Sequence, residues 1–138
     1  LTVVLAYAQE VGVGPSTLAV LATRGMVEVS RIGQTLGAEE STFTGLAGLG
    51  DLIAAVAGDD RPEIRLGRAL AKGATLSSAV GEAGAYIEGI EVAAQMMEHA
   101  QRLGLETPIS STFVALSQGR MSSDDAIQAL MERRVGRE

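Results

Sequence analysis

Cysteine and tryptophan are absent from this chain of 138 residues, and aromatic residues make up only 3% of it. Without cysteine there can be no disulfide, iron–sulfur cluster or catalytic thiol. The one histidine is too few for a conventional histidine-rich metal site. With so few aromatic residues an immunoglobulin-like sandwich is not expected. The core must instead consist of alanine, leucine, valine, isoleucine and methionine, a composition that favours helices.

Basic residues are also few, since 11 lysines and arginines stand against 17 acidic residues and give a net charge of −6. This balance repels nucleic-acid phosphates and anionic membrane surfaces. The longest apolar runs, residues 3–8 and 52–57, are far shorter than the ~20 residues that a membrane-spanning helix needs. We therefore expect a cytoplasmic protein with no nucleic-acid partner and no membrane insertion. Because the chain begins inside an apolar run at Leu1, we also expect a C-terminal piece of a longer protein.

Apolar residues make up 46% of the chain and recur mainly at helical spacing. The clearest helix is predicted over residues 16–36, with a start signal at Pro15 and a stop signal at Gly37. Its polar face is expected to carry Arg24, Glu28, Arg31 and Thr35. On that face we expect Arg24 to pair with Glu28, one turn later.

A second long helix is predicted over residues 88–103 and ends at Gly104. His99, on its polar side, is expected to be a solvated surface residue rather than a metal ligand. Shorter helices are predicted over residues 2–11, 49–57, 62–71, 76–81, 109–117 and 123–134. No segment shows the sustained two-residue alternation of a strand. The sequence therefore predicts an all-α domain of about eight helices.

Two glycine-rich segments are candidates for ligand contact. Residues 12–17 (GVGPST) lack the third glycine of a dinucleotide fingerprint and follow a predicted helix, so we interpret them as a loop between helices. Residues 45–52 (GLAGLGDL) place three glycines before Asp51, where an apolar helix begins. Asp51 is then either the N-cap of that helix or a functional carboxylate that the flexible backbone allows a ligand to approach. The spacing alone leaves both interpretations open.

Longer strings of residues resemble a known family. Residues 21–28 (LATRGMVE), 31–33 (RIG) and 42–52 (TFTGLAGLGDL) look like the C-terminal domain of bacterial NAD(P)-dependent glycerol-3-phosphate dehydrogenase, and residues 88–89 (EG) and 104–109 (GLETPI) stand where that family has similar motifs. The resemblance covers nearly the whole chain. It implies that residues 1–138 form an all-helical substrate-binding domain, similar to the fold of the 6-phosphogluconate dehydrogenase C-terminal domain.

The same resemblance implies an oxidoreductase that interconverts glycerol 3-phosphate and dihydroxyacetone phosphate, a step that supplies glycerophospholipid precursors. NAD or NADP would be bound mainly by an N-terminal Rossmann domain that this chain does not contain. The expected partners are therefore a small phosphorylated substrate, that Rossmann domain and, in a homodimer, a second copy. The chain by itself is expected to be inactive.

The resemblance also carries over site residues. The family's catalytic lysine, in a Lys-Asn-Val motif, would stand just before Leu1. Asp51 matches the active-site aspartate that accompanies this lysine and the substrate hydroxyl, so it is the catalytic and substrate-binding candidate. Glu88 matches a glutamate that contributes to cofactor binding.

Two places depart from the family's pattern. Ala55 stands where the family commonly has a substrate-site threonine. Residues 61–63 read Arg-Pro-Glu where the family's Ser-Arg-Asn binds the substrate phosphate. The difference removes the motif's arginine, whose guanidinium can donate two hydrogen bonds to a phosphate, and its asparagine, whose amide can donate another. Glu63 adds a negative charge instead. Phosphate binding would then depend on Arg61 or Arg65.

These departures leave two alternatives beside the dehydrogenase. One is a sister dehydrogenase that acts on another hydroxy acid or phosphorylated alcohol. The other is a non-catalytic helical domain used for dimerisation or regulation. An intact Lys-Asn-Val and a GxGxxG motif in an upstream sequence would favour an enzyme.

Overall fold

The computed structural model describes residues 1–58 and 60–132, and within these ranges it contains helices and no strand. The elements in chain order are α1 (Thr2–Glu10), α2 (Pro15–Thr35), α3 (Glu40–Thr44), the π-helical turn η1 (Leu46–Gly50), α4 (Asp51–Ala57), α5 (Pro62–Ala71), α6 (Leu76–Ala83), α7 (Glu88–Arg102), α8 (Pro108–Ser117) and α9 (Ser123–Glu132). The prediction of an all-α domain is confirmed.

All eight helices predicted from the sequence are present, with ends that differ by a few residues. The longest, α2, begins at the predicted proline and ends two residues before the predicted glycine stop. The sequence does not predict α3 and η1, two five-residue segments that lie between α2 and α4. Residues 133 and 134, the predicted end of the last helix, lie outside the described residues.

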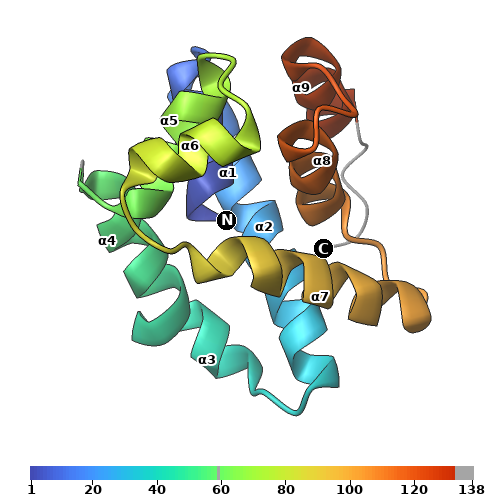
Figure 1. The fold of residues 1–138 in the computed structure, drawn as a ribbon. Helices are drawn as coiled ribbons and strands as arrows, with labels where there is room; N and C mark the ends of the chain where they lie inside the picture. Colours follow the sequence, from blue (N-terminus) through green and yellow to red (C-terminus); the bar gives the residue numbers. More distant parts are fainter. Residues whose placement is uncertain (59, 133–138) are drawn as a thin grey trace.

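Helix α1 lies at the centre of the domain, between α5 and α2 (Figure 1). It is apolar nearly all round, as expected of a helix that is covered on all sides. One side, through Val3 and Tyr7, packs in a cluster with α5, α6 and α8. The other side, through Leu5 and Ala8, packs in a second cluster with α2 and α4. α1 therefore joins the two halves of the core.

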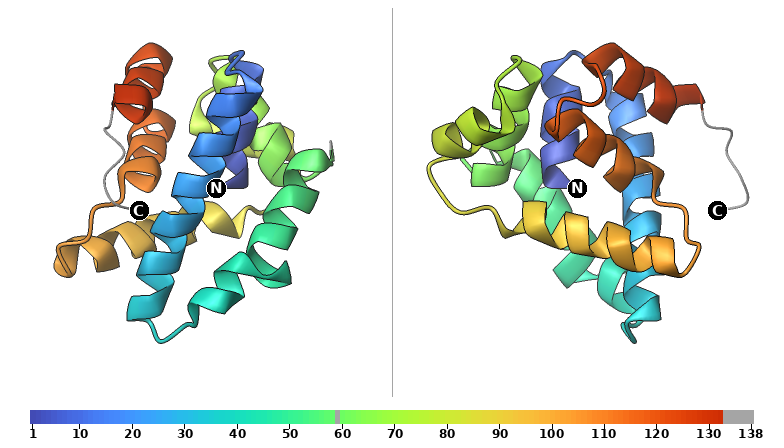
Figure 2. Two further views of the ribbon diagram at one scale, coloured as in Figure 1. Left: turned by 180° about the vertical axis from the view of Figure 1, so that it is seen from behind. Right: turned by 45° about the vertical axis from the view of Figure 1, so that its right-hand side comes forward.

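The long helix α2 sets the dimensions of the domain. Figure 2 shows it running through the domain from end to end, with α3, η1 and α4 returning from its C-terminal end as a second arm. α8 and α9 pack together as a pair on the other side of the domain. This arrangement brings α4 and α5, which are adjacent in sequence, to one edge of the domain next to α1.

A buried carboxylate ties α2 to α8. Glu28 is only 4% exposed, and its Oε2 accepts a hydrogen bond of 2.9 Å from the backbone N–H of Ile109. Its Oε1 accepts a 2.9 Å bond from the N–H of Ser110 and another from the Ser110 hydroxyl. These N–H groups belong to the first turn of α8, where no intrahelical acceptor is available. The expectation that Glu28 lies on the exposed face and pairs with Arg24 is therefore wrong: its carboxylate caps a helix 81 residues away in sequence.

His99 is half-buried rather than fully solvated, which corrects the prediction made from its helical position. Its Nε2 lies 2.9 Å from the hydroxyl of Thr35. That hydroxyl donates to the carbonyl of Ile32 at 2.6 Å, so its remaining role toward His99 is that of acceptor. The contact joins the last turns of α2 and α7.

Helices α1 and α5 approach closely because Gly67 has no side chain. A Cβ at this position would lie 2.5 Å from the carbonyl oxygen of Val3, 2.7 Å from the Cβ of Ala6 and 3.0 Å from the backbone nitrogen of Tyr7. Two of these three atoms belong to the backbone of α1, so they cannot rotate away. The whole helix would have to move.

We expect Gly67→Ala to lower the free energy of unfolding of the chain by about 2–3 kcal/mol, the upper part of the range of about 1–3 kcal/mol observed for overpacked cores. Gly81→Ala is the matched control, because Gly81 lies within α6 and a Cβ added there would meet no atom within 4 Å. There the added methyl should be neutral or stabilise the helix by about 0.5–1 kcal/mol. Urea unfolding of both variants measures the difference, and equal stabilities would contradict the close α1–α5 packing.

Candidate active site

Asp51 lies where η1 continues into α4 without a break in the helical backbone. Gly50 has helical dihedral angles (φ −61°, ψ −46°), and its N–H donates to the Gly45 carbonyl at 3.1 Å, a π-type bond. Gly48 permits this turn, since a Cβ there would lie 2.1 Å from the Phe43 carbonyl oxygen. Asp51 is the first residue of α4 and makes no side-chain capping bond. The N-cap interpretation of Asp51 is therefore wrong.

The carboxylate of Asp51 pairs instead with Arg61. Arg61 Nη2 donates to Oδ1 at 3.0 Å, and Nη1 donates to Oδ2 at 3.3 Å, so the guanidinium meets the carboxylate as a fork. The side chain of Asp51 is 59% exposed and that of Arg61 is 42% exposed. The structure thus brings together the two residues that the sequence singled out as substrate-binding candidates, at a surface that a solute can reach.

Arg61 is held at the N-terminus of α5. It is the N-cap residue of that helix and precedes Pro62 at the first helical position, as the sequence predicted. Its backbone carbonyl accepts the N–H groups of Ile64 and Arg65. The hydrogen bonds that Arg61 donates to Asp51, and then the negative charge of Asp51, raise the pKa of the Arg61 side chain, so this residue is a cation at any ordinary pH.

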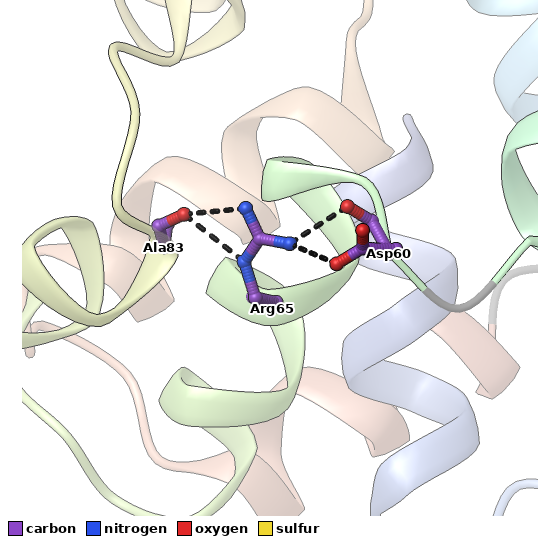
Figure 3. A network of polar contacts seen from close by, with 3 residues as sticks. All are labelled: Asp60, Arg65 and Ala83. Carbon is purple, nitrogen blue, oxygen red and sulfur yellow. Dashed lines mark hydrogen bonds and ion pairs between the residues drawn. The ribbon is translucent and has the colours of Figure 1, made fainter.

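The second candidate for phosphate binding, Arg65, is occupied by contacts within the domain (Figure 3). Its Nε and Nη2 donate to the carbonyl of Ala83 at 3.0 and 2.8 Å. Its Nη1 donates to the carbonyl and the carboxylate of Asp60 at 2.7 and 2.6 Å. Ala83 is the last residue of α6, whose carbonyl has no helical partner. Arg65 therefore fixes the end of α6 to the segment before α5.

The two positions that depart from the family's pattern lie in different surroundings. Ala55 is fully buried in α4, so its side chain contacts the interior rather than the Asp51–Arg61 edge. Glu63, in the first turn of α5, is half-buried and lines a cavity of about 120 Å³. Glu28 and Ser110 line the same cavity. Glu63 therefore adds negative charge to this cavity, and its charge also acts on Arg61.

Glu88 is exposed in the first turn of α7. Its neighbour Gly89 lines the same cavity as Glu63. Close by in sequence, the hydroxyl of Tyr86 donates to Glu91 at 2.8 Å, and this hydrogen bond is the main reason why the pKa of Tyr86 is raised. No contact joins Glu88 to Asp51 or Arg61 among the hydrogen bonds and ion pairs of the described residues.

Several other kinds of site find no support in the described residues. They contain no group of three His, Cys, Asp or Glu side chains that could hold a metal ion. Residues 12–17 form the loop between α1 and α2 and the first turn of α2, so no strand–turn–helix cradle for a dinucleotide is present there. No single helix of the described part is long and apolar enough to cross a bilayer, although the bent pair Glu40–Ala57 and Pro62–Ala71 together has that length and composition.

Comparison with known proteins identifies the family. Residues 1–128 match the family described as NAD-dependent glycerol-3-phosphate dehydrogenase C-terminus. A glycerol-3-phosphate dehydrogenase [NAD(P)+] of Leptothrix cholodnii is 41% identical over 133 residues, which are 96% of this chain and 40% of that protein. Its counterpart in Dechloromonas aromatica is 43% identical over 122 residues, or 88% of this chain and 37% of that protein.

The fold agrees with this family. The crystal structure of a glycerol-3-phosphate dehydrogenase from Coxiella burnetii matches 96% of this chain with a TM-score of 0.87 and 30% identity, and the match covers 41% of that protein. The chain thus spans about two fifths of the length of the relatives that it matches. It belongs to the C-terminal domain family of NAD-dependent glycerol-3-phosphate dehydrogenases.

Proposed function

We propose that this chain is the substrate-binding domain of a longer NAD(P)-dependent glycerol-3-phosphate dehydrogenase. The observation that carries the proposal is the forked contact between Asp51 and Arg61 at an exposed edge. A carboxylate beside a guanidinium can hold both ends of such a substrate, since the carboxylate accepts a hydrogen bond from a hydroxyl and the guanidinium binds an anion. The relatives are named glycerol-3-phosphate dehydrogenase [NAD(P)+], and we match this chemistry to the reaction in that name.

In the proposed reaction glycerol 3-phosphate loses a proton from its secondary hydroxyl and a hydride from the carbon that carries it, which gives dihydroxyacetone phosphate. The nicotinamide cofactor, when bound, accepts the hydride. Asp51 orients the hydroxyl and balances the charge of a lysine that precedes Leu1, which takes the proton. Because Asp51 stands on a continuous helix rather than on a loose loop, its carboxylate is well placed to orient the hydroxyl.

The cofactor would be held mainly outside this chain. The described residues offer no dinucleotide cradle, and we assign Glu88 only an edge contact with the cofactor, at the exposed start of α7. An N-terminal Rossmann domain would supply the cradle and the choice between NAD and NADP.

That domain would also cover the apolar residues beside the site. Leu46 is 91% exposed and Ile53 is 60% exposed, on either side of Asp51 in sequence. Such residues are costly to leave in water together, and about three fifths of the relatives' length lies outside the present match. Homodimer formation stays a prediction.

A sister dehydrogenase with another hydroxy substrate is the second candidate, and Glu63 favours it. In the first turn of α5, Glu63 repels a phosphate dianion near Arg61, while Arg65 is engaged with Ala83 and Asp60. A substrate with less negative charge would meet less repulsion.

Two measurements test the domain assignment together. The full-length protein should oxidise NADH or NADPH in the presence of dihydroxyacetone phosphate. This chain alone should neither do so nor bind either nucleotide in a calorimetric titration. A micromolar dissociation constant of the isolated chain for NADH or NADPH would contradict the proposal that the cofactor is bound mainly by a separate Rossmann domain.

Restoring the family's phosphate residues should improve substrate use. In the full-length protein we expect Pro62→Arg combined with Glu63→Asn to lower the KM for glycerol 3-phosphate about tenfold, since one charge-assisted hydrogen bond is worth about that factor. Steady-state kinetics would show it, with Asp124→Asn in α9 as a charge-matched control that leaves KM unchanged. A low micromolar KM in the wild type would mean that its own cations already bind the phosphate well.

A further inference from the structure

The Asp51–Arg61 contact joins two side chains that each have a separate task in the proposed reaction. Arg61 donates one hydrogen bond to each oxygen of the carboxylate. The fork therefore occupies one lone pair on each carboxylate oxygen. The positive charge of Arg61 also offsets the negative charge with which Asp51 would attract a hydroxyl or a cationic lysine. In this arrangement Asp51 is already occupied before any substrate arrives.

The contact is nevertheless easy to exchange. Both side chains are well exposed, and ion pairs in that setting are weak because water screens them. A phosphate dianion offers a guanidinium the same forked geometry with more charge than a carboxylate. Arg61 can therefore pass from Asp51 to a substrate phosphate without an unpaired charge being left in the interior.

Other cations of this part of the fold are less free to move. Arg65 holds the carbonyl at the end of α6 as well as Asp60. At the C-terminal end of α5, Arg68 Nε and Lys72 Nζ lie 3.8 and 3.3 Å from the carboxylate of Glu10, which ties α5 to α1. Arg61 differs because its side-chain bonds go to the catalytic candidate itself.

We propose that Arg61 is a specificity-determining residue that exchanges partners: it holds Asp51 in the free enzyme and moves to the anionic group of the substrate, which releases Asp51 for the reacting hydroxyl. This inference rests on the proposed function and adds a selection rule to it. A hydroxy compound without an anionic group cannot draw Arg61 away, so it meets an occupied Asp51. Substrates with a phosphate release the carboxylate as they bind.

The kinetic test compares dihydroxyacetone phosphate with dihydroxyacetone, which lacks the phosphate, in the full-length protein. For Arg61→Gln we expect kcat/KM to fall at least about tenfold for the phosphorylated compound, because its charge-assisted bonds are lost. For the neutral compound we expect kcat/KM to rise about three- to fivefold, the most that release of an exposed ion pair can give. The two substrates should thus respond in opposite directions.

Arg102→Gln is the matched control, because Arg102 is an exposed arginine that pairs with Glu98 on α7, away from the site. It should leave both values unchanged. A fall in kcat/KM for both compounds with Arg61→Gln would overturn the exchange, since a merely structural arginine would act in that way. If the wild type turns over neither compound, the proposed function fails, and the exchange is then decided by binding.

The binding measurement uses calorimetric titration of the full-length protein with inorganic phosphate. Because Asp51 competes for Arg61, Asp51→Asn should tighten phosphate binding about fivefold. Asp60→Asn removes the same charge beside Arg65 and should tighten it less. Arg61→Gln should abolish the binding. Equal effects of Asp51→Asn and Asp60→Asn would show general electrostatics rather than competition, and would overturn the exchange.

Discussion

Replacement of Glu28 by alanine should lower the free energy of unfolding of the chain by about 3–4 kcal/mol, the sum expected for leaving one buried and one half-buried backbone donor without an acceptor. In the wild type these donors are the N–H groups of Ile109 and Ser110, each 2.9 Å from a carboxylate oxygen. The truncation also leaves a void between α2 and α8. Few surface-exposed glutamates of a helix would show an effect of this size.

The control for this prediction is Glu28→Gln. The amide keeps one oxygen as an acceptor but places an NH₂ group against the other donor, so the loss should be intermediate, about 1–2 kcal/mol. Glu98→Ala, on the exposed face of α7, should change stability by less than about 0.5 kcal/mol. Urea unfolding of the three variants gives the comparison. Similar small losses for Glu28→Ala and Glu98→Ala would show that the buried cap contributes little.

For Asp51→Asn in the full-length protein we expect kcat for glycerol 3-phosphate to fall roughly 100-fold or more, as for loss of a group that orients the reacting hydroxyl and balances the charge of the lysine that takes its proton. Asparagine keeps the shape of the side chain and removes its charge. The melting temperature should stay within about 2 °C of the wild type, because the exposed Asp51 caps no helix.

Asp60→Asn provides the charge-matched comparison for this variant. Asp60 lies between α4 and α5, and its carboxylate accepts a hydrogen bond from Arg65 rather than from the proposed substrate. Its kcat should stay within about threefold of the wild type, which corresponds to well under 1 kcal/mol in the barrier. If Asp51→Asn instead lowers the melting temperature while kcat is retained, Asp51 has a structural role and the reaction centre lies elsewhere.

The features that the sequence predicts correctly depend on neighbours along the chain. The ends of α2 follow from a proline and a glycine close to the helix ends, and the first turn of α5 follows from Pro62. α3 and η1 escape prediction because five residues make little more than one helical turn, which is too short for a helical repeat to be seen in the sequence. They depend on the close approach of the Phe43 backbone to Gly48 and of the Phe43 ring to Gly33 in α2.

The misplaced residues depend on partners that are distant in sequence. Glu28 has the spacing of a surface pair with Arg24, and nothing in that spacing indicates the start of α8. For the site, resemblance selects Asp51, and the basic residue types select Arg61 and Arg65. The fork between Asp51 and Arg61, and the bond from Arg65 to Ala83, require the turn between α4 and α5 and the position of α6. Helical periodicity in the sequence does not predict how these helices are placed relative to one another.

Binding of the substrate across Asp51 and Arg61 can be seen in a crystal structure of the full-length protein with glycerol 3-phosphate and its oxidised cofactor. We expect the secondary hydroxyl to lie within hydrogen-bonding distance of the Asp51 carboxylate, and the Arg61 guanidinium to have left Asp51 for the phosphate. A substrate bound away from this edge, with the Asp51–Arg61 fork still closed, would contradict this expectation.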